Sequence, residues 1–324
     1  MGPISHRLNR EVWRLVRQTA RTTRSRGVLH FAGPLATVTM LMGWLAGLWV
    51  GFALIYLPFV AHFSSSVHTR PSGLFAALYA SATMLTTLGI GDLLPIRNGM
   101  RVAIASEAGL GVATVSAAIS YILSVYPLTT QTRAHALRFS DLHVRSPTAA
   151  RAFIAAAGLS GLASLHQQLI DSHQSLRRFP VLYYFHPQRE EESVKRLLES
   201  ATILCIVARW ARPAELPGYT ATVACGLQAT LTRVRRDYET RYIGGRSGAP
   251  EREHPPDEQL RATLRSLREQ PYETAAPTDP TAKEVKEFEA FLTAMERFLA
   301  GLSRSQLYHH EPLLHQLSAR SAQP

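Results

Sequence analysis

The stretch Thr86-Thr87-Leu88-Gly89-Ile90-Gly91-Asp92 decides how the rest of this chain is organised. Two hydroxyl residues are followed by glycines that alternate with large apolar residues. Glycine adopts positive φ angles at little cost, so such a segment can turn successive backbone carbonyls to one side. We expect the side chains of Leu88 and Ile90 to point away from these carbonyls and to pack behind them. The stretch is therefore predicted to be a loop that presents a row of carbonyl oxygens.

Two long apolar segments flank this loop, and a shorter one leads directly into it. Residues 35–63 contain no Asp, Glu, Lys or Arg, and residues 102–126 contain only one, so each is long enough for the ~20-residue helix that crosses a membrane. Residues 74–85 are too short to cross, which predicts a re-entrant helix that ends at the loop. The fold is therefore predicted to be all-α, with a membrane pore module (outer helix, re-entrant pore helix and loop, inner helix) and a helical cytoplasmic domain.

Rings of backbone carbonyls can replace the hydration shell of a cation. Over roughly residues 35–127 the chain resembles the bacterial type of two-transmembrane-helix potassium channel, whose selectivity filter usually reads T-V-G-Y-G-D or T-V-G-F-G-D. The resemblance implies a filter formed by Thr87, Leu88, Gly89, Ile90 and Gly91, with K⁺ as the permeant ion held at the first four. Since the chain has one such loop and a closed ring needs four, a homotetramer is expected.

The resemblance also assigns supporting roles around the filter. Thr86 and Asp92 flank it, and Tyr79 lies where the family's pore helix usually carries an aromatic residue. Gly111 lies where the inner helix often has a hinge glycine, although close helix packing explains a glycine there equally well. Glu107, the single acid of the inner segment, is expected behind the filter near the outer end, with a structural role rather than ion binding.

Two positions depart from the family. Ile90 replaces the central aromatic residue, and Thr83 lies where some members carry a buried glutamate, so that brace is predicted to be absent. The leading hypothesis is a potassium-selective channel, and the alternative is a weakly selective monovalent cation channel. A non-conducting membrane-anchored sensor with a pore-like module is a third possibility. The sequence contains no recognisable nucleophile–base pair, so we predict that the protein is not an enzyme.

The positive charge of the chain points to a membrane surface. The 324 residues carry a net charge of +11, and the apolar segments favour membrane lipids over nucleic acid as the partner. Residues 4–26 are predicted to form a basic amphipathic helix on anionic lipid, with Trp13 at the interface, and a solvated arginine-rich tail is the alternative. Its two faces are an arginine face (Arg7, Arg10, Arg14, Arg17, Arg21 and Arg24) and an apolar face (Ile4, Leu8, Val12, Leu15 and Thr19). The positive-inside rule then predicts a multi-pass protein of the plasma or inner membrane with both termini in the cytoplasm.

The remainder of the chain is predicted to be a helical regulatory part whose ligand and gating stimulus the sequence does not identify. It lacks the glycine fingerprint of a nucleotide-binding domain, and no organic cofactor is indicated. Residues 181–185 are expected to be a buried connector. The predicted segments are a basic amino-terminal segment (1–30), the pore module (31–127), a helical domain (128–243), a linker region with a short helix (244–280), and a carboxyl-terminal helix with its tail (281–324).

Three smaller patterns occur in this part. The apolar residues Val285, Phe288, Leu292, Met295, Leu299 and Leu302 form a heptad seam, which could pack within its own domain or associate with symmetry-related chains. His309, His310 and His315 are interpreted as part of a solvated tail rather than as metal ligands. Cys205 and Cys225 are expected to be reduced core residues if this part is cytosolic.

Overall fold

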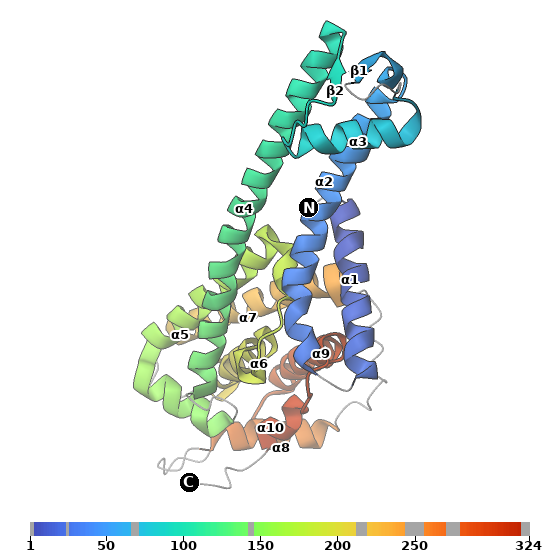
Figure 1. Ribbon diagram of the computed structural model, residues 1–324. Helices are drawn as coiled ribbons and strands as arrows, with labels where there is room; N and C mark the ends of the chain where they lie inside the picture. Colours follow the sequence, from blue (N-terminus) through green and yellow to red (C-terminus); the bar gives the residue numbers. More distant parts are fainter. Residues whose placement is uncertain are drawn as a thin grey trace. The chain divides into compact units, whose positions relative to one another are not determined.

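The computed structural model describes residues 3–23, 26–65, 71–141, 146–211, 219–243, 256–269 and 279–318. These residues are almost entirely helical and include one short two-stranded ladder, so the all-α prediction is confirmed (Figure 1). The chain divides into two compact units. The first holds Met1–Thr129 with Phe179–His186, and the second holds Thr130–Arg178 with Pro187–Pro324.

The first unit contains the three helices expected of the pore module. Its described elements are α1 (Pro3–Thr22), a 3₁₀ turn (Arg26–Phe31), α2 (Ala32–Tyr56), a second 3₁₀ turn (Val60–His62), β1 (Phe63–Ser65), α3 (Gly73–Leu85), β2 (Leu93–Pro95), the part of α4 (Asn98–Asp141) up to Thr129, and a 3₁₀ helix (Pro180–Tyr184). The outer helix is α2, the re-entrant helix is α3 and the inner helix is α4. Between β1 and α3, residues 66–70 lie outside the described part.

The inner helix is longer than predicted. We expected it to end near residue 126, before Pro127, but α4 continues through this proline to Asp141. A proline inside a helix removes one backbone hydrogen bond and costs about 3 kcal/mol. The helix-compatible residues on both sides outweigh that local loss, so the proline does not end the helix.

The amino-terminal helix is formed, but its apolar face is used differently from the prediction. Val12, Trp13, Val16 and Ala20 are buried, whereas Leu15 is 65% exposed. The helix lies alongside α2 (Figure 1), so these residues have a protein partner. The predicted position of Trp13 at a lipid interface is therefore wrong. The arginine face is the part of α1 that stays exposed.

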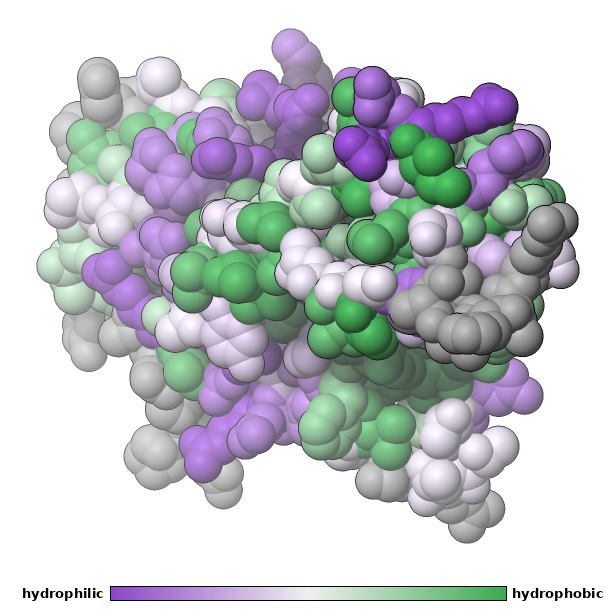
Figure 2. Space-filling model, turned by 45° about the horizontal axis from the view of Figure 1, so that its top comes forward, coloured by the Kyte–Doolittle hydropathy of each residue, from purple (hydrophilic) through white to green (hydrophobic). Residues whose placement is uncertain are grey.

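Large apolar side chains stay exposed along α2 and α4. On α2 they include Leu35, Val38, Met42, Trp44, Val50, Leu54 and Ile55, and on α4 they include Val102, Leu110, Val112, Val115, Ile119, Leu123 and Tyr126. Apolar residues are likewise open on the face drawn in Figure 2, between hydrophilic ones. An apolar surface of this extent is typical of a protein that meets lipid or other chains.

Three helical segments are long and apolar enough to cross a membrane, namely Gly27–Tyr56, Asn98–Ser140 and Pro147–Arg178. The third, α5, was not predicted as a span. Gly158 interrupts it with φ 58° and ψ −154°. Its His166 and His173 lie 2.8 and 2.9 Å from polar side chains of the second unit. Its buried apolar residues include Ile154, Leu162, Leu165 and Leu169, and the helix belongs to the second unit.

The second unit is a helical bundle built around α6. Its described elements are the remainder of α4, α5 (Pro147–Arg178), a 3₁₀ turn (Glu190–Glu192), α6 (Val194–Ile206), a π turn (Val207–Ala211), α7 (Tyr219–Tyr238), a second π turn (Glu239–Ile243), α8 (Asp257–Arg268), α9 (Ala282–Gln306) and α10 (Leu313–Ser318). Nearly every residue of α6 is buried, which is the pattern of a central helix. Most of the predicted linkers, residues 244–255 and 270–278, lie outside the described residues.

The heptad seam on α9 is buried inside the second unit. All six of its apolar residues are buried there, together with Phe291 and Phe298. Trp210 packs against Phe288 and Phe291, with ring centroids 5.5 and 5.6 Å apart. The helix begins with a capping box between Thr281 and Glu284. Packing within the domain therefore accounts for the seam, which is not free to pair with other chains.

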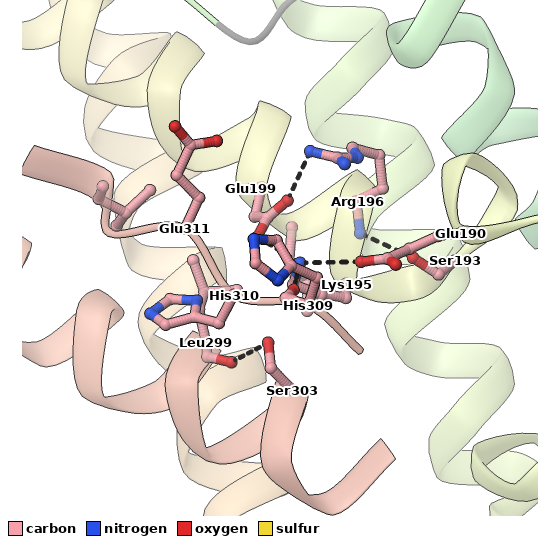
Figure 3. Close-up of polar contacts among 12 residues, drawn as sticks. Glu190, Ser193, Lys195, Arg196, Glu199, Leu299, Ser303, His309, His310 and Glu311 are labelled. Atoms are coloured by element: carbon pink, nitrogen blue, oxygen red, sulfur yellow. Dashed lines mark hydrogen bonds and ion pairs between the residues drawn. The ribbon is translucent and has the colours of Figure 1, made fainter. Parts of the chain in front are cut away.

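The three histidines near the carboxyl end differ in their surroundings: His309 and His315 are exposed, as expected of a solvated tail, whereas His310 is partly buried, which corrects the prediction for that residue. His310 lies 2.8 Å from Glu296 on α9, and the backbone carbonyl of His309 accepts a hydrogen bond from Lys195 (Figure 3). Lys195 is buried and is neutralised by Glu199 at 2.9 Å and by Glu190 at 3.3 Å. This paired charge cluster ties the backbone at His309 to α6.

The two cysteines have different surroundings. Cys205 is buried, and burial raises the pKa of its thiol. Cys225 is exposed, with a guanidinium nitrogen of Arg209 at 2.9 Å from its sulfur. The expectation of two core cysteines is therefore wrong for Cys225.

Candidate functional site

The loop that follows α3 has the alternating backbone expected from its sequence. Thr87, Gly89 and Gly91 have φ angles of 57°, 47° and 81°, whereas Leu88 and Ile90 between them are not in the positive range. A positive φ costs a residue with a Cβ about 1–2 kcal/mol, and such strain is typically kept at functional sites. A Cβ added at Gly89 or Gly91 would meet no atom within 4 Å in this chain. The glycines are thus needed for backbone conformation and not for space.

The start of the loop is fixed by the last turn of the pore helix. The backbone N–H groups of Leu88 and Gly89 both donate to the carbonyl of Thr83, at 2.9 and 3.2 Å. The hydroxyl of Thr83 donates back to the Ala80 carbonyl at 2.9 Å. The two bonds to the Thr83 carbonyl satisfy a group that a helix end otherwise leaves open, and they set the direction in which the loop leaves α3.

The end of the loop is held by two contacts. The Tyr79 hydroxyl, on the pore helix, donates to the Asp92 carboxylate at 2.8 Å. Directly after Asp92 the chain enters β2, which pairs antiparallel with β1 in the register Ser65↔Leu93. The loop is therefore fixed at its far end both to the pore helix and to the segment that follows the outer helix.

Glu107 lies behind the pore helix and joins three helices. It is fully buried, and the Tyr56 hydroxyl of α2 donates to its Oε2 at 2.6 Å. The Ser81 hydroxyl of α3 lies 2.5 Å from Glu107 Oε1 and 2.8 Å from the Trp49 carbonyl. The indole of Trp49 in turn donates to the Leu78 carbonyl at 2.8 Å. The carboxylate thus accepts hydrogen bonds from protein on both oxygens.

Sequence reasoning did not identify Tyr56 and Ser81 as the partners of Glu107. A signal was nevertheless present, because both are hydroxyl residues within apolar helices, as a buried acid in the neighbouring helix requires. The pore helix carries no acid at Thr83, as the sequence shows, and the nearby carboxylate comes from the inner helix instead.

Gly111 lies at the closest approach between α4 and the end of α3. A Cβ at this position would clash with the Leu85 carbonyl oxygen, whereas a Cβ at Gly109 would meet nothing within 4 Å. The helix α4 continues through Gly111 without a break. This glycine therefore allows the inner helix to pass directly behind the residue that ends the pore helix.

The side chains of the loop do not pack inside this chain. Leu88 is 67% exposed and Ile90 is 58% exposed, so the packing predicted behind the carbonyl row is absent within one described chain. Thr86 and Thr87 are exposed as well, with their hydroxyls bonded to nearby backbone carbonyls. The loop is thus anchored at both ends while its central face is open.

The pore module was compared with known proteins. Residues 39–126 match the model of a family described as ion channel. The pore module therefore contains an ion-channel domain. The expected resemblance to two-transmembrane-helix potassium channels is thereby confirmed at the level of the family. The match covers the ion-channel domain alone, from within α2 to the second half of α4.

One relative extends beyond the ion-channel domain. An uncharacterized membrane protein of Bacillus subtilis (strain 168), YdjJ, is 27% identical over 203 residues, which are 59% of this chain. The alignment covers 57% of that protein, so the chain spans little more than half of its length. No solved structure matches the chain. The identification of the ion-channel domain therefore rests on the family match and on the geometry of the loop.

Proposed function

We propose that this protein is a potassium-selective channel that conducts K⁺ passively through a homotetrameric pore. The observation that carries the proposal is the loop from Thr87 to Gly91, in which three residues at alternating positions have positive φ angles. Four such loops would surround the ion with the carbonyls of Thr87, Leu88, Gly89 and Ile90. The carboxyl end of α3, which carries about half a negative charge, would face the waiting cation.

The apolar side chains that are exposed in one chain support the assembly of four chains. Leu88 and Ile90 are exposed apolar residues on a loop whose two ends are fixed. The exposed apolar residues of α4 continue over several turns below them. In a tetramer, neighbouring chains would cover part of this surface and lipid the rest. Cross-linking of the purified protein followed by mass measurement tests the stoichiometry, and a monomer would contradict the proposal.

The supports at the two ends of the loop favour selectivity over weak discrimination. Ile90 cannot brace the filter with an aromatic ring, but the Tyr79–Asp92 hydrogen bond holds the far end of the loop. The buried Glu107 network fixes the pore helix at the same time. A filter held this firmly keeps its carbonyls at one spacing, which is the condition under which ions of different size are distinguished.

Cation flux from liposomes tests the proposal directly. Purified protein is reconstituted, and K⁺, Rb⁺ and Na⁺ are offered in turn, with empty vesicles as the control. Uptake of K⁺ and Rb⁺ with little Na⁺ is the expected result. Equal uptake of Na⁺ would favour the weakly selective channel, and no uptake under any condition would favour the membrane-anchored sensor.

The charge of α1 supports one membrane orientation. With the arginines of α1 in the cytoplasm, α2 would cross outward and α4 would return, so both termini would be cytoplasmic. The second unit would then be a cytoplasmic regulatory domain in a cell membrane. Protease protection in sealed inside-out vesicles tests this orientation, since the second unit should be cleaved there without detergent.

We further propose that α1 contacts anionic lipid headgroups through its exposed arginine face. Arg7, Arg10, Arg14 and Arg21 are exposed on α1, and Arg14 lies 2.5 Å from Glu11. Each arginine near an anionic surface contributes about 1 kcal/mol. Flux in vesicles with phosphatidylglycerol should exceed flux in neutral vesicles, and Arg7→Gln/Arg10→Gln should reduce that difference. An equal flux in both kinds of vesicle would contradict the lipid contact.

A further inference from the structure

The segment Phe179–His186 belongs to the first unit although the chain on both sides of it belongs to the second. We call this segment the strap. It contains a 3₁₀ helix, Pro180–Tyr184, and Val181, Tyr183, Tyr184 and His186 are all buried. Burial of so many large side chains shows that the strap is an integral part of the packing of the first unit. The sequence predicted a buried connector here, but not its partner.

Two elements near the amino terminus hold one end of the strap. A Cβ added at Gly33 would lie 2.5 Å from the Cγ atom of Phe185, so the Phe185 ring fills the space beside this glycine. Trp13 of α1 stacks on His186, with ring centroids 5.3 Å apart and an interplanar angle of 27°. Tyr184 lies 6.0 Å from the same tryptophan. The strap is thus seated between α1 and the first turn of the outer helix.

The other end of the strap touches the inner helix. The ring of Phe179 meets the ring of Tyr121 edge-on, with centroids 5.6 Å apart and an interplanar angle of 69°. Tyr121 lies ten residues beyond Gly111 on α4, about 15 Å further along the helix. Val125, one turn later on the same face, is 1% exposed. The strap therefore links the outer helix and α1 to the inner helix, away from the filter.

The path of the chain connects the two ends of the strap directly to the second unit. The chain passes between the two units at residues 129–130, 178–179 and 186–187, and two of these three crossings are the ends of the strap. A displacement of the second unit must therefore pull on the strap or break its contacts.

We propose that the strap positions the inner helix and transmits the state of the second unit to the pore. This proposal rests on the proposed channel function and names its regulating element. Gly33, Phe179 and Tyr121 act as positioning residues: they touch no ion, and their contacts decide which conformation of the inner helix is favoured. Loss of one aromatic contact of this kind changes such an equilibrium by about 2- to 10-fold.

Single-channel recording of the reconstituted full-length protein in symmetrical K⁺ tests the proposal, with one variant at each end of the strap. Gly33→Ala displaces Phe185, and its matched control is Gly47→Ala on the same helix, where a Cβ meets nothing within 4 Å. Tyr121→Leu removes the ring that Phe179 contacts. Its control is Tyr121→Phe, which keeps the ring and loses a buried hydroxyl that has no hydrogen-bond partner among the described residues.

We expect both test variants to change the open probability by about 2- to 10-fold in the same direction. Unitary conductance and the K⁺/Na⁺ permeability ratio should stay unchanged, because the filter is untouched. The two controls should resemble the wild type. The double variant should show no more than the larger single effect, since both changes release the same strap.

Two results would overturn the proposal. One is an unchanged open probability in both test variants of an assembled, conducting protein. The other is a change in conductance or selectivity, which would mean that the substitutions disturb the pore itself. If the proposed channel function is wrong, the result is distinguishable, because the wild type itself would then pass no cation.

Hydrogen exchange provides a readout that does not depend on conduction. In the full-length protein, Gly33→Ala should speed exchange in residues 179–186 and also in residues 119–126 of α4, whereas Gly47→Ala should speed neither. Faster exchange in the strap alone would show that it does not hold the inner helix and would overturn the proposal even if Gly33→Ala lowers expression of the channel.

Discussion

The hydroxyl of Tyr79 donates a 2.8 Å hydrogen bond to the carboxylate of Asp92, and this bond joins the helix before the pore loop to the residue that ends it. Because the Leu88 and Gly89 amides are bonded to Thr83 on the same helix, the loop is fixed to α3 at both ends. The loop between these anchors can therefore hold a strained backbone that no packing inside the chain supports.

Removal of this bond should weaken ion discrimination. Tyr79→Phe keeps the ring and loses the hydrogen bond to a charged group, which is worth about 1.5–3 kcal/mol. We expect an assembled channel whose K⁺/Na⁺ permeability ratio, measured from reversal potentials, falls by about 3- to 10-fold. Tyr121→Phe, which removes an unpartnered hydroxyl, serves as the control. An unchanged ratio in Tyr79→Phe would show that the bond does not support the filter.

The backbone of the loop should not tolerate a side chain at Gly89. With φ at 47°, alanine is strained there by about 1–2 kcal/mol although no atom blocks its Cβ. Gly89→Ala should abolish K⁺ flux while the protein still assembles. Gly109→Ala, a change on the helical part of α4 where a Cβ also meets nothing, should conduct normally. Normal flux through Gly89→Ala would exclude this loop as the filter.

Ile90→Tyr should leave K⁺ permeation intact and should raise selectivity over Na⁺, if it changes it at all. The side chain at position 90 is exposed in one chain, so a larger ring can be accommodated without displacing the chain's own core. Paired K⁺ and Na⁺ flux measurements on the two proteins provide the comparison. A lower K⁺/Na⁺ ratio in an assembled Ile90→Tyr channel is the outcome that contradicts this prediction.

The hydrogen bonds of Glu107 should stabilise the protein, and losing more of them should destabilise it more. Glu107→Ala removes the acceptor for the Tyr56 hydroxyl and one of the two acceptors near the Ser81 hydroxyl, and a buried group left unsatisfied costs about 1–3 kcal/mol. Glu107→Gln retains one carbonyl acceptor and should lie between alanine and the wild type in thermal unfolding of the purified protein. Ser106→Ala, on the exposed side of α4, is the control. An alanine variant as stable as the wild type would refute the role of the network.

The stability of the second unit should depend on Glu284 in the acid range. Burial raises the pKa of Glu284, but the Thr281 N–H at 3.0 Å and the Arg268 guanidinium at 3.1 Å outweigh burial, so the pKa is lowered from 4.5. A folded-state pKa below the unfolded value gives stability that is present above the unfolded pKa and lost as pH falls through the folded pKa.

Glu284→Gln should therefore unfold at a lower temperature than the wild type at pH 7. The difference should shrink as pH falls below about 4.5. Glu289→Gln, on a half-buried position of the same helix, should match the wild type at every pH. A difference between Glu284→Gln and the wild type that is independent of pH would contradict this assignment of charge.

The pore module was largely predictable because its signals are local. The alternation around Gly89 and Gly91 and the lengths of the apolar segments are properties of short stretches, and the structure has helices and a loop at those places. The same holds for Glu107, whose rarity in an apolar segment marks it without any knowledge of its partners.

The parts that could not be predicted depend on which surfaces meet. Periodicity shows that α1 and α9 are amphipathic, but it does not tell whether lipid, another chain or the same chain covers the apolar face. The continuation of α4 beyond Pro127 depends on residues on both sides of the proline. The docking of Phe185 on Gly33 joins positions more than a hundred residues apart, for which one sequence contains no signal.

The different surroundings of the two cysteines give the protein a natural attachment point for probes. A maleimide dye reacts with an exposed thiol, so it should couple at Cys225 and spare Cys205, whose thiol is both inaccessible and hard to ionise. Each chain would then carry one fluorophore on α7, introduced without any engineered residue. Energy transfer between the labels would report how many chains are assembled. A change in that transfer during opening would report a change in the distance between the α7 helices of neighbouring chains.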